Sequence, residues 1–240
     1  MGEVELEKKT QLAEWEETRK ILLSKSPLAE IPTPVEYPES DGEPMAETDM
    51  HREQVFYLIH SLRNYFRDDP QVYVSGNLFL YYAEGDPDQK LAPDVFVVFG
   101  VQNRERSTYK LWEEGKGPDV VFEITSRGTW QEDLGSKKAL YAVLGVREYF
   151  LFDPLEEYLK PQLKGYHLEG EEYRRMPDDF TSSGERRLKS EVLGLELRLE
   201  EGRLRLYNPK TGQKLLTPAE LQDRLSELEA ELTRLRAEQS

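Results

Sequence analysis

The chain has 240 residues, a net charge of −15, 33% charged residues and no cysteine. This length is enough for one domain with a substantial core plus extensions. The lack of cysteine excludes disulfide frameworks, thiolate zinc sites and cysteine nucleophiles. The N-terminus is acidic, without an apolar signal region, and no apolar run is long enough to cross a bilayer. We therefore expect a cytoplasmic protein with no membrane partner.

The acidic charge argues against a nucleic-acid partner, because binding a phosphate backbone draws on basic surface. The charge is unevenly distributed, however. Residues 1–50 hold 5 Lys or Arg and 13 Asp or Glu, and residues 217–240 hold 3 and 6, so residues 51–216 carry only −4. Basic residues cluster there, as at Arg174 and Arg175, and such clusters indicate either solvated surface or phosphate contacts.

The N-terminal part is expected to contain a helix, a linker and a second helix. Residues 3–24 are rich in Glu, Lys and Leu, which predicts a helix that stops before Pro27. The five prolines of residues 27–44 predict an extended, acidic linker. An apolar stripe with helical spacing predicts a second helix over residues 48–66.

The middle of the chain alternates apolar strands with one helix. Continuous apolar runs indicate strands covered on both faces, and hence a central sheet flanked by helices. The predicted strands are residues 72–82, 93–99, 119–125 and 148–152, with a helix over 131–144 and short strands alternating with turns over 163–207.

The C-terminal segment predicts a short coiled coil. Thr217, Pro218 and Glu220 have the form of a capping box with proline at the first helical position. Steps of four and three residues then form an a/d seam, which consists of Leu221, Leu225, Leu228, Leu232 and Leu235. Because so short a seam is marginal alone, we expect it to pair with a second copy of the chain, to pack on the N-terminal helix, or to dock on its own domain.

Two acids interrupt predicted apolar strands, Asp94 and Glu123. A buried carboxylate needs a cation or strong donors nearby. Carboxylates that hold Mg²⁺ are what phosphodiester hydrolysis requires, and a structural salt bridge would meet the same need. Asp119 repeats the local pattern of Asp94. However, its Cα would lie about 13 Å from that of Glu123 on the same strand, so the two should not share a metal.

Lys137 lies at the centre of the apolar stripe predicted for the helix over residues 131–144. A lysine in that position should be paired with a carboxylate, and Glu123 is the acid most in need of a partner. An i,i+4 pair with Asp133 is the alternative. His51 and Glu53, near the start of the second helix, can approach the site but are interpreted as surface residues.

No phosphate loop, dinucleotide fingerprint, nucleophile elbow or zinc-binding histidine pair occurs. The blocks Pro118–Ser126 and Gly145–Pro154, with Asp133, Lys137 and Tyr141 between them, resemble the Uma-type restriction endonuclease family. That family is a branch of the PD-(D/E)XK nuclease superfamily. The resemblance extends from about residue 51 to residue 195.

The resemblance implies an α/β fold with a restriction-endonuclease-like central mixed sheet flanked by helices. To this core the sequence adds the N-terminal helix and the C-terminal coiled-coil helix. The expected parts are residues 1–47, a helix and acidic linker; residues 48–216, the nuclease domain; and residues 217–240, the coiled coil.

By position, Asp94 matches the motif aspartate of the superfamily and Glu123 its second acid. The E-x-K pattern expects a lysine where this chain has Thr125. The resemblance therefore implies that Lys137 supplies the missing cation from the helix.

The leading hypothesis is an Mg²⁺-dependent DNA endonuclease, with Mn²⁺ as a possible substitute, that acts as a homo-oligomer, preferably a dimer. Asp94, Glu123 and the backbone carbonyl of Ile124 would hold the metal, and Lys137 would orient or deprotonate the attacking water. The alternative is an inactive nuclease-fold scaffold that binds nucleic acid or protein and oligomerises through its helical ends. A third option is that the terminal helices recruit a separate partner.

Overall fold

The computed structural model describes residues 35–40, 42 and 48–238. The chain divides into two compact units, residues 1–36 and residues 37–240, and the fold below is that of the second unit. The predicted helix over residues 3–24 lies outside the described residues. The predicted domain boundaries after residues 47 and 216 stay predictions.

A six-stranded mixed sheet forms the centre of the unit, which confirms the predicted central sheet. Its strands, in spatial order, are β1 (Val72–Ser75), β4 (Val95–Phe99), β6 (Val120–Ile124), β7 (Glu148–Phe152), β8 (Leu163–Glu169) and β9 (Glu172–Arg175). Only β6 and β7 pair in parallel. Parallel neighbours need a crossover, and α4 (Trp130–Leu134) with α5 (Ser136–Val143) provides it.

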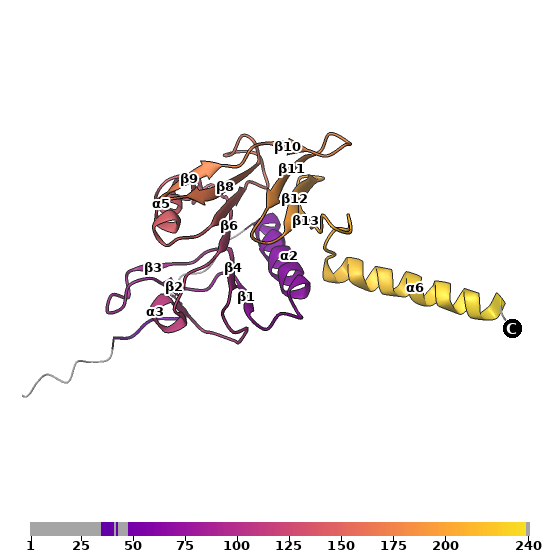
Figure 1. Cartoon of the computed structure of the whole chain (residues 1–240), viewed down its shortest axis with the longest axis horizontal. Coiled ribbons are helices and arrows are strands. Elements are labelled where there is room, and N and C mark those ends of the chain that lie inside the picture. Colours follow the sequence, from indigo (N-terminus) through magenta and orange to yellow (C-terminus); the bar gives the residue numbers. More distant parts are fainter. Residues whose placement is uncertain (1–34, 41, 43–47, 239–240) are drawn as a thin grey trace, which may run out of the picture. The chain divides into compact units, whose positions relative to one another are not determined.

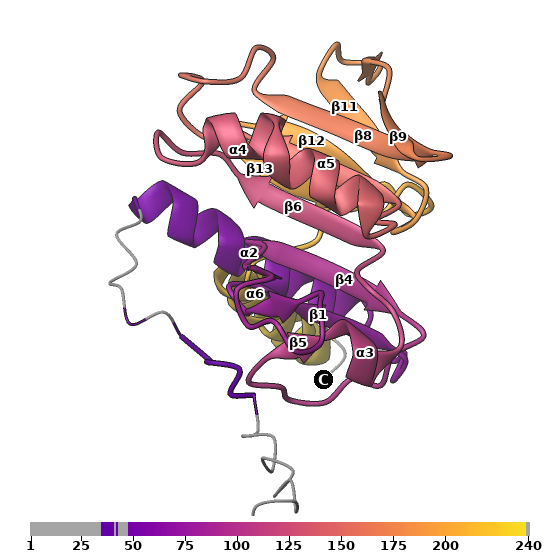
Figure 2. The ribbon, with the colours of Figure 1, turned by 90° about the vertical axis from the view of Figure 1, so that its left-hand side faces the viewer.

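Alternate residues of the central strands enter two separate cores, one on each face of the sheet. On β6, Val120 and Phe122 belong to the first core, whereas Val121 belongs to the second. The first core is covered by α2 (Asp49–Tyr65) and by a four-stranded sheet of β10 (Asp179–Phe180), β11 (Arg186–Ser190), β12 (Leu195–Glu200) and β13 (Arg203–Tyr207). On the other face, α4 and α5 lie over the strands (Figures 1 and 2). Each central strand is therefore covered on both sides, as its continuous apolar run predicts.

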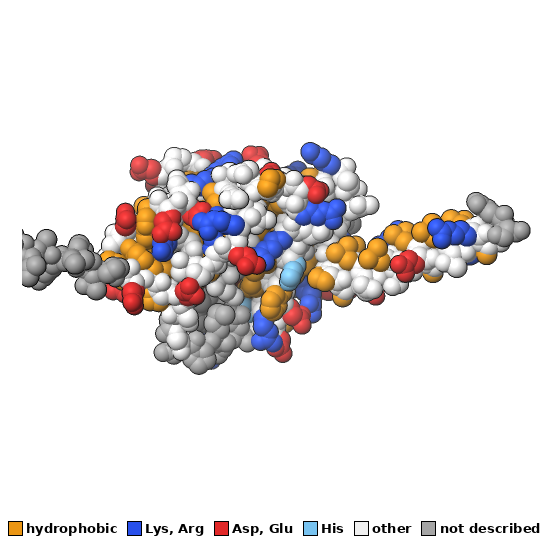
Figure 3. Space-filling model, turned by 90° about the horizontal axis from the view of Figure 1, so that it is seen from below, with side chains coloured by type: hydrophobic (Ala, Val, Ile, Leu, Met, Phe, Trp, Pro, Cys, Tyr) orange, Lys and Arg blue, Asp and Glu red, His pale blue; other side chains and the backbone are white. Residues whose placement is uncertain are grey.

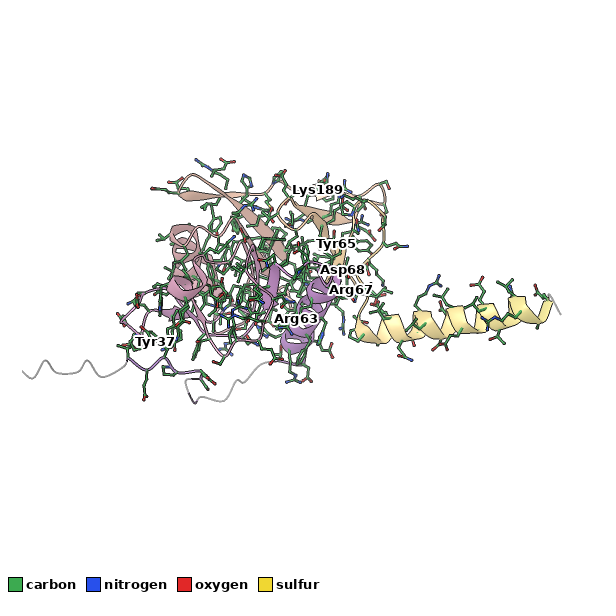
Figure 4. All side chains as sticks on the ribbon, turned by 60° about the horizontal axis from the view of Figure 1, so that its bottom comes forward. Tyr37, Arg63, Tyr65, Arg67, Asp68 and Lys189 are labelled. Atoms are coloured by element: carbon green, nitrogen blue, oxygen red, sulfur yellow. The ribbon has the colours of Figure 1, made fainter. Side chains whose placement is uncertain are left out.

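A small sheet of β2 (Leu80–Tyr81), β3 (Lys90–Leu91) and β5 (Tyr109–Lys110) adjoins the second core and continues into α3 (Leu111–Glu114). The ring of Tyr37 lies 5.0 Å from that of Tyr81 and 5.2 Å from that of Trp112. Arg63 of α2, labelled in Figure 4, donates to the carbonyl of Val74 at 2.9 Å, which ties α2 to β1.

Two predicted elements are interrupted. The strand expected over residues 72–82 ends at Ser75, because Gly76 and Asn77 turn the chain; Asn77 has φ of 49°. The helix expected over residues 131–144 is two helices, broken at Gly135, which has φ of −115° and ψ of −98°. These departures from regular structure let the chain pass close to Asp94 and set Lys137 at the start of a new helix.

The C-terminal helix, α6 (Pro218–Glu238), begins with the predicted capping box. Glu220 N donates to Thr217 Oγ1 at 3.1 Å, and Thr217 N donates to Glu220 Oε2 at 2.7 Å. Arg205 and Lys214 also pair with the Glu220 carboxylate and anchor this first turn. No helix among residues 48–238 is long and apolar enough to cross a membrane.

Candidate active site

Asp94 and Glu123 come from neighbouring antiparallel strands. The register pairs Val95 of β4 with Phe122 of β6, so Asp94 and Glu123 are the next residues along the two strands. Directly opposed residues of antiparallel strands have side chains on the same face. The sheet therefore brings together the two acids that the sequence singles out.

A backbone N–H group and a histidine ring lie against the Asp94 carboxylate. Ile124 N donates to Asp94 Oδ2 at 2.6 Å, and His51 Nε2 lies 3.3 Å from the same oxygen. The Asp94 side chain stays 15% exposed, so it is partly accessible to solvent. The interpretation of His51 as a surface residue is wrong, since it is 8% exposed and contacts Asp94. Glu53 is on the surface, where it pairs with Arg203 at 2.8 Å.

Glu123 is 1% exposed and has a protein partner at each carboxylate oxygen. The hydroxyl of Tyr141 donates to Oε1 at 2.6 Å, and Lys137 Nζ donates to Oε2 at 3.1 Å. Burial, together with the negative charge of Asp94, raises the pKa of Glu123 to about 8. The charge of Lys137 lowers this pKa only in part, and a divalent cation would be needed to keep the carboxylate ionised at neutral pH.

Lys137 bridges two buried acids from the start of α5. Its Nζ lies 3.1 Å from Glu123 Oε2 and 2.9 Å from Asp133 Oδ1. The i,i+4 pair and the pair with the strand acid therefore exist together. Burial alone would lower the pKa of Lys137, but the charges of Glu123 and Asp133 outweigh it and raise that pKa well above its usual value. The lysine is therefore an ammonium ion in this arrangement.

Asp119 takes no part in this cluster, as the strand spacing predicts. Its Oδ2 accepts hydrogen bonds from Phe99 N and Lys116 Nζ, both at 2.8 Å. Thr125, which follows β6, is 3% exposed, and its hydroxyl has no hydrogen-bond partner among the described residues. The cation beside Glu123 thus comes from α5 and not from the strand.

The close approach of Gly76 to Asp94 is a site feature that the sequence analysis missed. A Cβ at residue 76 would lie 2.0 Å from the carbonyl oxygen of Asp94. Only glycine permits this contact. The glycine after the first strand is a weak signal of it, because an isolated glycine near a strand often marks such an approach.

Two carboxylates, those of Asp94 and Glu123, are ligands of the kind that a divalent cation takes. The charge of Asp94 contributes to the raised pKa of Glu123, and a bound cation would relieve that repulsion. Within residues 48–238 no group of three or more histidine or acidic side chains is arranged to hold a metal. Protein ligands would therefore be few. Mg²⁺ commonly binds through one or two carboxylates and retains several waters, so a site with few protein ligands is compatible with Mg²⁺.

Comparisons with known proteins match a family model and several solved structures. A family model named Uma2, described as "Putative restriction endonuclease", matches residues 26–201. A crystal structure described as a putative nuclease belonging to DUF820 from Anabaena variabilis is similar with a TM-score of 0.43 and 16% identity. The likeness covers 60% of this chain and 78% of that one. No curated protein matches the chain.

Proposed function

The chain belongs to the Uma2 family, and on that premise we propose that it is a metal-dependent endonuclease with a restriction-endonuclease-like core that hydrolyses phosphodiester bonds of DNA. One observation supports the proposal most: the ammonium group of Lys137 lies 3.1 Å from Glu123, the buried acid of the strand. The strand itself has Thr125 where the nuclease pattern expects a lysine. Phosphodiester hydrolysis needs acids for a metal and a cation for the phosphate at one place.

The carboxylates of Asp94 and Glu123, with the backbone carbonyl of Ile124, are the groups that would hold Mg²⁺ or Mn²⁺. When bound, the metal supplies an activated water and stabilises charge on the phosphoryl oxygens. Ile124 N and His51 restrain the Asp94 carboxylate, and Tyr141 restrains that of Glu123. These contacts fix the two acids before substrate arrives, which lowers the cost of organising the site.

Lys137 acts as a hydrogen-bond donor in this proposal. Because its pKa is raised, it carries a proton at neutral pH and can orient the attacking water or stabilise a phosphoryl oxygen. Asp133 holds the ammonium group at 2.9 Å while that group contacts Glu123. We therefore assign Asp133 a positioning role for the lysine.

A plasmid-nicking assay with added Mg²⁺ or Mn²⁺ tests the proposal. We expect the wild-type protein to nick supercoiled DNA, and Asp94→Ala and Lys137→Ala each to abolish nicking. Two matched controls should retain activity. Asp119→Ala removes an acid just before β6, and Lys138→Ala removes the lysine next to Lys137 in α5. Undiminished cleavage in both Asp94→Ala and Lys137→Ala would overturn the assignment.

A nuclease-fold scaffold without catalysis is the second candidate. It is favoured by the net charge of −15 and by the protein donors already present at both oxygens of Glu123. Calorimetric titration with Mn²⁺ separates the candidates. The endonuclease proposal predicts binding that is lost in Glu123→Ala, whereas a scaffold predicts no binding or binding that Glu123→Ala leaves unchanged.

A further inference from the structure

The helix α6 presents a row of five leucines to solvent. Their exposed fractions are 38% for Leu221, 56% for Leu225, 39% for Leu228, 53% for Leu232 and 43% for Leu235. No residue of α6 is buried. Apolar side chains extend along the helix in Figure 3. An apolar row of this length on an otherwise polar helix indicates an interaction surface.

The leucine spacing places the row at the core of a two-helix seam. Steps of four, three, four and three residues assign Leu221, Leu228 and Leu235 to d positions and Leu225 and Leu232 to a positions of a heptad. The capping box and the ion pairs of Glu220 fix the helix start. The seam therefore begins at the first turn after an anchored point.

The charges beside the seam are complementary in a parallel arrangement. Arg224 and Glu231 occupy g positions, and Glu229 and Arg236 occupy e positions. In a parallel, in-register pair, each g residue faces the e residue five positions later on the other helix. Arg224 would then face Glu229 of the partner subunit, and Glu231 would face Arg236 of the partner subunit. Arg224 now pairs with Glu227 on its own helix at 3.0 Å, an exposed contact that is easily exchanged.

An antiparallel arrangement aligns fewer leucine layers than the parallel one. When a positions face d positions, an antiparallel pair aligns only four of the five leucines. In the register that aligns Leu225 with Leu235 of the partner subunit, Glu229 and Glu231 would each face the same residue of the partner subunit. Like charges in those positions are unfavourable. In the register that aligns Leu221 with Leu232 of the partner subunit, Arg224 would face Glu231 of the partner subunit. The preference for the parallel orientation therefore rests on its five aligned leucine layers.

We propose that α6 pairs with α6 of a second copy of this chain as a parallel, in-register coiled coil. The proposal is independent of whether the site hydrolyses DNA. Parallel pairing would carry two candidate active sites at the same end of the coil, so one dimer would present both to a substrate.

Light scattering of the full chain over a range of concentrations tests the pairing. We expect a concentration-dependent mass that approaches twice 28.0 kDa. The double variant Glu229→Arg, Arg236→Glu keeps the net charge but places like charges across the seam, and should weaken association at least about tenfold. The matched control, Glu227→Arg with Arg234→Glu, alters outward positions and should leave association unchanged. A wild-type monomer at every concentration, or equal association of all three proteins, would overturn the proposal.

Cysteine cross-linking tests the orientation, since the chain has no cysteine of its own. Parallel pairing places residue 235 against its counterpart, so Leu235→Cys alone should form a disulfide dimer under mild oxidation. Antiparallel pairing would place residue 235 against residue 225 in one register and residue 221 against residue 232 in the other. Failure of Leu235→Cys to form a disulfide alone, with disulfides when it is mixed with Leu225→Cys or when Leu221→Cys is mixed with Leu232→Cys, would therefore overturn the parallel assignment.

Discussion

Replacing Lys137 with methionine removes the ammonium group that separates two buried acids. Glu123 and Asp133 are each 1% exposed and lie 3.1 and 2.9 Å from Lys137 Nζ. Breaking a buried ion pair typically costs about 3–5 kcal/mol. Because the Lys137 side chain is 17% exposed, we expect Lys137→Met to lower the free energy of unfolding by about 3 kcal/mol, near the lower end of this range. For a chain of this size that lowers Tm by about 6–12 °C.

The stability lost in Lys137→Met should depend on pH. Burial raises the pKa of both acids above their values in the unfolded chain, so each carboxylate becomes costly to ionise as the pH rises above those unfolded values. Near pH 5 Glu123 is protonated and needs its cation least. The difference in unfolding free energy between wild type and Lys137→Met should therefore be largest above pH 8 and smallest near pH 5.

Urea unfolding of the metal-free proteins, followed by tryptophan fluorescence at pH 5 and pH 8.5, measures this difference. Lys138→Met is the matched control, because it removes the same charge from the next residue. Lys138 Nζ lies 3.8 Å from the centroid of the Tyr166 ring, a contact worth about 0.5–1 kcal/mol. Equal losses in the two variants, or a loss in Lys137→Met that does not change with pH, would refute the reasoning.

Three further predictions concern the metal site and its support. Since the pKa of Glu123 is about 8, Mn²⁺ affinity measured by calorimetry should fall as the pH is lowered from 9 to 6, and a constant affinity would contradict this. Gly76→Ala should destabilise the fold and weaken Mn²⁺ binding through its clash with Asp94. Gly128→Ala, whose added Cβ would meet only Ser126 Oγ at 3.9 Å, should do neither, and equal behaviour would count against the close approach. Glu148→Ala should lower the unfolding free energy by about 2 kcal/mol, because two backbone N–H groups between β11 and β12 lose their acceptor. An unchanged urea midpoint would exclude that role.

The contact between Lys137 and Glu123 could be predicted because it depends on two local periodicities. Helical spacing places Lys137 among core-facing residues, and strand spacing buries Glu123, so a pairing between them satisfies both. The break at Gly135 does not alter this, because Asp133 and Tyr141 still reach the same cluster. The two strands that carry the acids were predictable for the same reason, since their apolar runs leave few other placements.

The contacts of His51 and Gly76 with Asp94 could not be predicted from local sequence patterns. His51 reaches Asp94 because of the way α2 packs across the sheet, a long-range arrangement on which its neighbours in sequence give no information. The approach of Gly76 to the Asp94 carbonyl depends on the path of two loops relative to each other. Tertiary packing determines both contacts, so neither residue type nor spacing alone reveals them.

The most direct test of the central claim is a crystal structure of the wild-type protein with Mn²⁺, in which the ion is located from its anomalous signal. The proposal predicts one ion coordinated by carboxylate oxygens of both Asp94 and Glu123, with Lys137 Nζ directed at a water or phosphate oxygen beside it. An ion that contacts neither acid, or a site that stays empty at saturating Mn²⁺ while Lys137 remains paired with Glu123, would contradict it.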